Sequence, residues 1–483
     1  MHKRGEAGTS MIVRVRAELA TPRSRKTARN TMPSDAAIEQ RAANNPDNPP
    51  LTAAQLASRH LLRDAPPKVL YRSVGTTHAG PCTAVAAAPR GQLMQHVMSR
   101  MNLLGLLAGL LLPAYAAHTQ GANASVARGS PTAERLPIYV VDPTWPPTLP
   151  NDWTWGDIRG LFVDDRDHLW IIHMPSSLTD QEIGAASKPP IADCCFPAPP
   201  VIELDANGKL VQAWGGPGAG YTWFSQEHGI YIDHHGFVWM GTSNGMHVMK
   251  FTQDGTYVMT IGEPGVNKGS NDSTHLGGPA NFYVEPKTNE LFIADGYINK
   301  RVIVFDATTG AYKRHWGAYG KRPDDSVRYS YPVKTASPPQ QYSTLHGLVG
   351  TKDGLLYVSD RRGNRIQLFR QNGEFLMERF IRPQTGGSGS GFSLQVSRDA
   401  EQSLLYLIDG TNQRVWILRR KDLAILDRFG RPGRQSGEFI RAHMIAIDSK
   451  NRMYTGEAGN GRRIQRWILQ GTRPASSVTP PTP

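Results

Sequence analysis

A short strand-like segment recurs six times along this chain of 483 residues, and that repeat constrains the fold more than any other feature. Each copy is rich in aromatic and β-branched residues, as half-buried strands are. The six copies are residues 168–173, 237–242, 290–295, 355–360, 404–409 and 452–457. Regular self-similarity of this kind predicts stacked or radially arranged units that bury a core only together.

The segments around each copy predict four strands per unit. Most copies follow another apolar run and a polar turn, and several precede a third run such as 300–305 or 364–369. A turn containing Gly and a fourth run then complete the unit. Six such units predict an all-β, six-bladed β-propeller over residues 137–471, whose closure leaves few sheet edges exposed. The last unit lacks its outer strand, and we expect residues 137–142 to supply it.

Composition and charge exclude one class of function. The 48 Gly and 36 Pro suit a turn-rich β protein. The net charge of +13 suggests nucleic-acid binding, but residues 1–100 hold 15 Lys and Arg against 6 Asp and Glu, which is most of that charge. The remainder shows no basic stripe with interleaved aromatic residues. We therefore expect no nucleic-acid partner.

The N-terminal part resembles a leader rather than a domain. Residues 1–100 lack sustained apolar periodicity and are expected to be disordered, with translation starting at Met94, Met98 or Met101. Residues 101–116 combine a basic flank, an apolar run and an A-x-A end, which predicts a signal peptide. That run is too short to span a membrane. We expect a linker at 117–136, a disordered tail at 472–483, and a secreted or periplasmic protein.

Two of the three cysteines are adjacent, in a Pro-rich loop. Cys194 and Cys195 can close only a strained disulfide, because adjacent Cα atoms lie closer together than most bridges require. The sequence leaves two interpretations open, a pair that stiffens the loop or a ligand for a soft metal.

Three histidines open the first strands of the second, fourth and sixth units. The first-strand positions that we align are Arg159, His228, Asn281, His346, Ser393 and His443. In a closed six-bladed ring, alternate blades would bring the three imidazoles together at one end of the axis. Three imidazoles with an open fourth position are a ligand set of catalytic zinc. The sequence therefore predicts a zinc site of His228, His346 and His443.

Turns such as the one around Asn364 resemble the NHL-repeat signature, and residues 137–471 resemble peptidyl-α-hydroxyglycine α-amidating lyase and its bacterial relatives. That family binds zinc through three histidines at strand starts, and these histidines occupy those places. Its catalytic tyrosine lies in an Asp-Gly-Tyr turn, which matches Tyr297. The resemblance thus implies a zinc lyase with Tyr297 as general base or proton relay.

Three positions depart from the family pattern. Met174 stands where the family has a catalytic arginine, and Arg441 replaces a methionine near the third zinc histidine. Met444 replaces a calcium-binding aspartate, which argues against a structural calcium. We expect Arg441 or Arg159 to supply the missing cation by binding an anionic group of the substrate. Glu227 is expected to orient a ligand histidine.

These residues favour a monomeric zinc-dependent lyase or hydrolase that acts on a small polar or peptidic substrate. The alternative is a non-catalytic secreted propeller that binds a protein or glycan partner, since propellers host unrelated functions. A calcium lactonase fits less well, because calcium sites are built from oxygen ligands.

Overall fold

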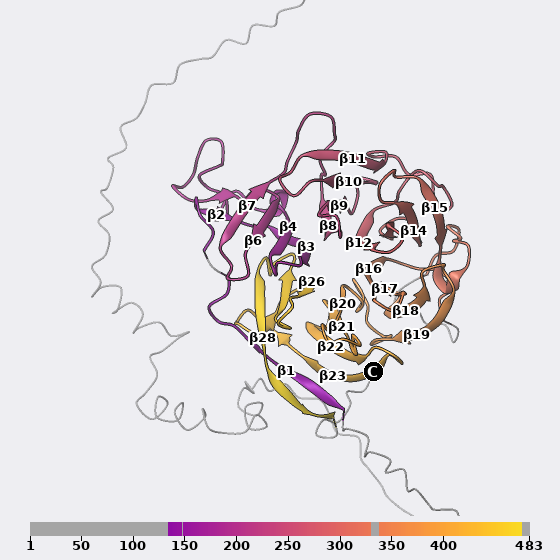
Figure 1. Cartoon of the computed structure of the whole chain (residues 1–483). Coiled ribbons are helices and arrows are strands. Elements are labelled where there is room, and N and C mark those ends of the chain that lie inside the picture. The colour runs from indigo at the N-terminus through magenta and orange to yellow at the C-terminus, as the bar shows by residue number, and fades with distance from the viewer. Residues whose placement is uncertain (1–133, 147, 330–337, 476–483) are drawn as a thin grey trace, which may run out of the picture. The chain divides into compact units, whose positions relative to one another are not determined.

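The protein is described by a computed structural model that covers residues 134–146, 148–329 and 338–475. Within these residues the chain forms six four-stranded antiparallel sheets arranged as blades around one axis (Figure 1). The predicted six-bladed β-propeller is therefore confirmed. The expected N-terminal extension and signal peptide, residues 1–116, lie outside the described residues.

Five blades are consecutive in sequence. From the innermost strand outward, blade 1 comprises β3 (Asp157–Val163), β4 (Leu169–Met174), β6 (Val201–Leu204) and β7 (Leu210–Trp214). Blade 2 comprises β8 (Glu227–Ile232), β9 (Val238–Thr242), β10 (His247–Phe251) and β11 (Tyr257–Gly262). Blade 3 comprises β12 (Pro279–Glu285), β13 (Glu290–Asp295), β14 (Arg301–Asp306) and β15 (Tyr312–Trp316). Blade 4 comprises β16 (Leu345–Gly350), β17 (Leu355–Asp360), β18 (Arg365–Arg370) and β19 (Phe375–Phe380). Blade 5 comprises β20 (Leu394–Val396), β21 (Leu404–Asp409), β22 (Arg414–Arg419) and β23 (Ala424–Phe429).

Blade 6 is built from both ends of the described chain and closes the ring. Its strands are β26 (Ala442–Ile447), β27 (Met453–Glu457), β28 (Ile464–Pro474) and β1 (Arg135–Val141). Arg135 pairs with Pro474 and Val141 with Trp467, so β1 supplies the outer strand that was expected from residues 137–142. This pairing extends the propeller slightly beyond the predicted bounds at 137 and 471, because each of the two strands satisfies the backbone groups of the other.

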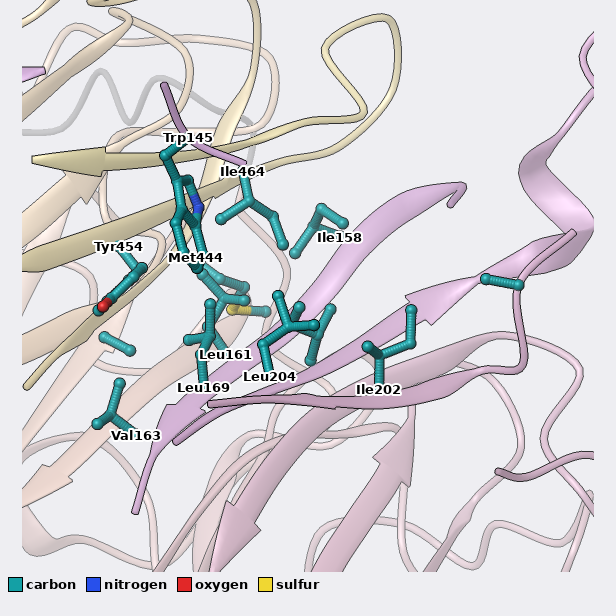
Figure 2. Close-up of a cluster of buried hydrophobic side chains, with 13 residues drawn as sticks. Trp145, Ile158, Leu161, Val163, Leu169, Ile202, Leu204, Met444, Tyr454 and Ile464 are labelled. Carbon is teal, nitrogen blue, oxygen red and sulfur yellow. The ribbon is translucent and has the colours of Figure 1, made fainter. Parts of the chain in front are cut away.

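Apolar side chains fill the spaces between blades. Figure 2 shows the cluster at the junction of blades 6 and 1, where Ile158 and Leu161 of β3 meet Met444 of β26 and Tyr454 of β27. Trp145, in the segment after β1, covers the same cluster. Full burial of one such side chain is worth about 1.5–3 kcal/mol. The first and last blades are therefore joined by packing as well as by the β1–β28 ladder.

The inner strands carry a register shift where they start. In blades 1, 4 and 6 the ladder to the second strand passes over one residue, and those residues are Arg159, His346 and His443. Such a bulge leaves a residue unpaired and re-aims its side chain. We call this level of the inner strands, where Arg159, His346 and His443 lie, the hub.

Short elements lie between the blade strands. A segment between β4 and β6, residues 175–200, contains η1 (Pro175–Ser177) and β5 (Phe196–Pro197), which pairs in parallel with β2 (Trp153–Thr154). We call this segment the insert. Other short elements are η2 (Ala318–Gly320) and the pair β24 (Arg431–Pro432) and β25 (Glu438–Phe439). Among the described residues, no helix has the length and apolar character needed to cross a membrane.

Cys194 and Cys195 lie in the insert and are joined as a disulfide. Of the two interpretations that the sequence left open, the structure therefore contains the disulfide-bonded pair within the loop.

Candidate metal centre

His228, His346 and His443 meet at the hub, as the sequence predicts. They come from β8, β16 and β26, and their potential ligand atoms all lie within 4.8 Å of one another. The ring centroids are 4.9 Å apart for His228 and His346 and 5.1 Å apart for the other two pairs. All three side chains are buried.

Backbone carbonyls of the intervening blades fix each ring. The Nδ1 of His228 lies 2.9 Å from the carbonyl of Ala280, that of His346 lies 2.9 Å from Phe392, and that of His443 lies 2.8 Å from Ile158. A carbonyl only accepts, so each Nδ1 must donate a proton. Each Nε2 is then left with a free lone pair that faces the centre of the triad.

The geometry fits a tetrahedral metal ion. The Nε2 atoms of His346 and His443 lie 3.3 Å apart. Because each ring carries its proton on Nδ1, both Nε2 atoms are acceptors and cannot hydrogen-bond to each other. Two nitrogens at about 2.0–2.1 Å from one tetrahedral zinc are separated by about 3.3 Å. The observed separation therefore matches two ligands of a shared ion.

Burial keeps the triad neutral. Removal from water lowers the pKa of His228 to about 3, and the positive charge of Arg159 adds to the shift. The pKa values of His346 and His443 are also well below their usual range, again mainly because of burial. Neutral imidazole is the form that binds a metal, so the site needs no deprotonation near neutral pH.

Tyr297 lies over the open side of the triad. It is in the turn after β13, and its hydroxyl is 2.8 Å from Nε2 of His228 and 3.1 Å from Nε2 of His346. The backbone amide of Tyr297 donates to the carbonyl of Gly278, which holds the turn in place. The structure therefore brings the predicted catalytic tyrosine together with two of the predicted ligands.

Arg361 is a site residue that the sequence analysis missed. Its Nη1 lies 3.3 Å from the hydroxyl of Tyr297, and its guanidinium lies over the rings of Tyr297 and Phe392 at 5.3 and 5.0 Å. It directly follows Asp360 at the end of β17. The register of the blades places it level with Met174, which follows His173 at the corresponding end of β4.

A comparison of blades could have identified Arg361. At this level, the last residue of β4 is Met174, and the residues directly after the other second strands are Ser243, Gly296, Arg361, Gly410 and Ala458. Arg361 is the single charged residue among these neutral ones, and that difference is the signal. It is easily overlooked in the sequence because its Asp-Arg-Arg-Gly-Asn turn resembles an ordinary repeat turn.

Of the two predicted cations, Arg159 lies next to the triad. It follows Ile158, whose carbonyl holds His443, and its charge contributes to the lowered pKa values of His228 and His443. Arg441 has an exposed side chain that lies against Gly459. Within the described part of the chain, no hydrogen bond joins Arg441 to Tyr297 or to the three histidines, so Arg159 and Arg361 flank the site instead.

Two further expectations need correction. The carboxylate of Glu227 accepts from the indole of Trp223 at 2.9 Å, while the ligand rings are oriented by backbone carbonyls. The strand register also places Ala280, not Asn281, at the level of His346. In blade 5, Ser393 likewise lies one residue beyond that level. The bulge changes the count of residues along each inner strand, and a repeat alignment without gaps cannot show that.

A second group of possible ligands lies on blade 1 but is already neutralised. Asp164, His168 and Glu203 lie close together. Nη2 of Arg166 contacts Asp164 at 2.6 Å and Glu203 at 2.8 Å. The guanidinium thus occupies the place of a cation, and the group is an ion-pair network.

Comparisons with known proteins find sequence relatives among the α-amidating enzymes. The chain is 36% identical over 188 residues to peptidyl-α-hydroxyglycine α-amidating lyase 2 of Drosophila melanogaster, covering 36% of this chain and 41% of the relative. It is 27% identical over 241 residues to peptidyl-glycine α-amidating monooxygenase B of Xenopus laevis, covering 46% of this chain and 24% of the relative. The chain thus matches less than half the length of either relative.

No protein-family model matches the chain. Among solved structures, a streptogramin B lyase aligns with a TM-score of 0.41 and 15% identity, covering 69% of this chain and 98% of that one. From the coordinates and the sequence relatives together, the chain is a six-bladed β-propeller that resembles the peptidyl-α-hydroxyglycine α-amidating lyases and NHL-repeat proteins.

Proposed function

We propose that this protein is a zinc-dependent lyase that cleaves a small anionic peptidic substrate of the peptidyl-α-hydroxyglycine class. The observation that carries the proposal is the hydroxyl of Tyr297 held at 2.8 and 3.1 Å from two Nε2 atoms of a neutral histidine triad. The similarity to α-amidating lyases supports the reaction class. The apolar run and flanks of residues 101–116 support the further proposal that the protein is exported.

The side chains around the triad suit this reaction. A zinc ion held by the three Nε2 atoms would supply a Lewis acid for a substrate oxygen. Arg159 and Arg361 would bind the carboxylate, since guanidinium groups suit that shape and charge. Tyr297 lies where the hydroxyl proton of the substrate must leave.

The bond changes balance without a further reactant. The hydroxyl of an N-acyl-α-hydroxyglycine loses its proton toward Tyr297 as its oxygen forms a carbonyl. The carbon–nitrogen bond breaks, and the amide nitrogen takes up a proton. The products are an amide and glyoxylate. Tyr297 can move the proton from oxygen toward nitrogen, which is a relay with no net consumption.

Metal analysis combined with a lyase assay tests the proposal. The full chain should bind about one zinc, and His228→Ala, His346→Ala and His443→Ala should each lose it together with glyoxylate release from N-acetyl-α-hydroxyglycine. An exposed histidine in a turn, changed as His235→Ala, is the matched control and should keep both. Zinc retained in the triad variants would overturn the metal site. Zinc binding without glyoxylate release would overturn the lyase and favour a binding protein.

A further inference from the structure

Arg159 reaches the hub with only part of its hydrogen-bonding capacity used. Its Nη2 donates to Asp157 at 2.7 Å, and its side chain is 19% exposed. Its Nε is buried and has no hydrogen-bond partner among the described residues. The guanidinium therefore has a donor left beside the triad that the carboxylate of a ligand would satisfy.

Asp157 connects Arg159 to a second arginine. The carboxylate of Asp157 receives Nη2 of Arg159 on one oxygen and Nε of Arg462 on the other, at 3.3 Å. Asp157 is 5% exposed, and Arg462 comes from the turn between β27 and β28. The carboxylate is thus clamped between two blades, which restricts the guanidinium of Arg159 to one direction.

Arg462 also fastens the insert. It forms an ion pair with Glu182, and its Nη2 donates to the carbonyl of Ser177 at 2.5 Å. Ser177 in turn accepts from the backbone amide of Asp157 at 2.8 Å through its hydroxyl. The guanidinium of Arg462 therefore links the insert to the carboxylate of Asp157. Through that carboxylate it is also linked to Arg159, the cation beside the triad.

The backbone conformation at Arg462 decides which substitution suits a test of its side chain. Its φ is +39°, in the left-handed region that few side chains favour. Met246, Asn364 and Gln413 hold the corresponding turn position in blades 2, 4 and 5, with φ values of 61°, 56° and 57°. Asn suits this conformation better than Arg. Arg462→Asn therefore removes the side-chain contacts of Arg462 without adding backbone strain.

We propose that Arg462 and Asp157 are positioning residues that hold Arg159 as a carboxylate-selecting group of the site, coupled to the insert. The inference rests on the proposed function, because it assumes an anionic substrate at the triad. It assigns to blade 1 a cation on β3, while the end of β4 carries Met174.

Ligand binding tests the positioning role without turnover. The zinc-loaded full chain is titrated by calorimetry with N-acetylglycine and with its neutral amide, N-acetylglycinamide. We expect the wild type to prefer the carboxylate at least tenfold, and Arg159→Gln to lose most of that preference, with Arg361 left as the remaining cation. Arg462→Asn, which suits the turn, should weaken N-acetylglycine binding three- to tenfold without changing the amide, and Arg462→Lys should partly restore it.

Controls separate positioning from folding. Met246→Asn changes the same turn position in blade 2 and should leave both affinities unaltered. If Arg462→Asn does not fold, Asp157→Asn is measured in its place and should also weaken the preference for the carboxylate. A wild type without carboxylate preference, or positioning variants within twofold of wild type, would overturn the inference. Absence of glyoxylate release by the wild type would instead count against the proposed lyase and leave these binding results intact.

Discussion

At the scale of single residues, protonation gives the triad the lone pairs that a cation would bind. Three Nδ1 atoms donate to the carbonyls of Ala280, Phe392 and Ile158, so three lone pairs face one another in a buried space. Such acceptors are costly without a partner. The hydroxyl of Tyr297 can donate to one of them at a time, which leaves the others for a metal ion.

Tyr297→Phe removes the oxygen that contacts the triad and keeps the ring. We expect glyoxylate release to fall about 10²–10⁴-fold, which is the usual contribution of a proton-transferring group. Zinc content should stay near one per chain, since the ring nitrogens of the triad are unchanged. Steady-state kinetics with metal analysis on the same samples measures both. Activity within threefold of wild type would exclude Tyr297 from proton transfer.

At the scale of elements, sequence reasoning succeeded where the repeat is regular. The second strands and the closing strand from residues 137–142 were predictable, because alternation and turn chemistry repeat in every blade. The bulges were not predictable, since a register shift depends on the partner strand. For that reason the alignment missed Ala280, while the three histidines still converged.

Gly229 tests how strictly the inner strands must approach each other. Its φ is +73°, and an added Cβ would lie 2.6 Å from the carbonyl oxygen of Ala280, the atom that holds His228. Gly229→Ala should therefore lower the free energy of unfolding by about 2–4 kcal/mol and weaken zinc binding. Urea unfolding and a competitive zinc titration measure the two effects.

Gly354→Ala is the control for Gly229→Ala. Gly354 has a φ of +76°, and an added Cβ there would meet nothing within 4 Å. It should therefore show only the backbone strain, about 1 kcal/mol, and normal zinc affinity. Equal effects of the two substitutions would mean that the collision with Ala280 is unimportant.

At the scale of the whole molecule, buried neutral histidines make stability depend on pH. The pKa of His228 is lowered to about 3 and that of His173 to about 4, in both cases by burial. Between pH 6.5 and these values, the unfolded chain binds protons that the folded chain does not. The stabilising contribution is thus complete above pH 6.5 and is lost as the pH falls toward 3.

The metal-free protein should therefore lose several kcal/mol of unfolding free energy between pH 7 and pH 5, about 2 kcal/mol for each such histidine. His228→Gln should reduce this loss by about that amount, because glutamine does not titrate. Urea unfolding in a chelating buffer at the two pH values measures the difference. An unchanged loss in the variant would show that His228 is not held neutral by the fold.

The pairing of β1 with β28 also determines when, during synthesis of the chain, the ring can close. Arg135 can pair with Pro474 only after nearly all of the described chain has left the ribosome. The carbonyl of Ile158 likewise cannot accept from His443 until that late residue has been made. A polypeptide that ends before His443 therefore carries two of the three imidazoles but not the complete triad. Under the proposed function, metal binding would therefore come late in synthesis, and a chain whose synthesis stops early would lack one of the three ligands.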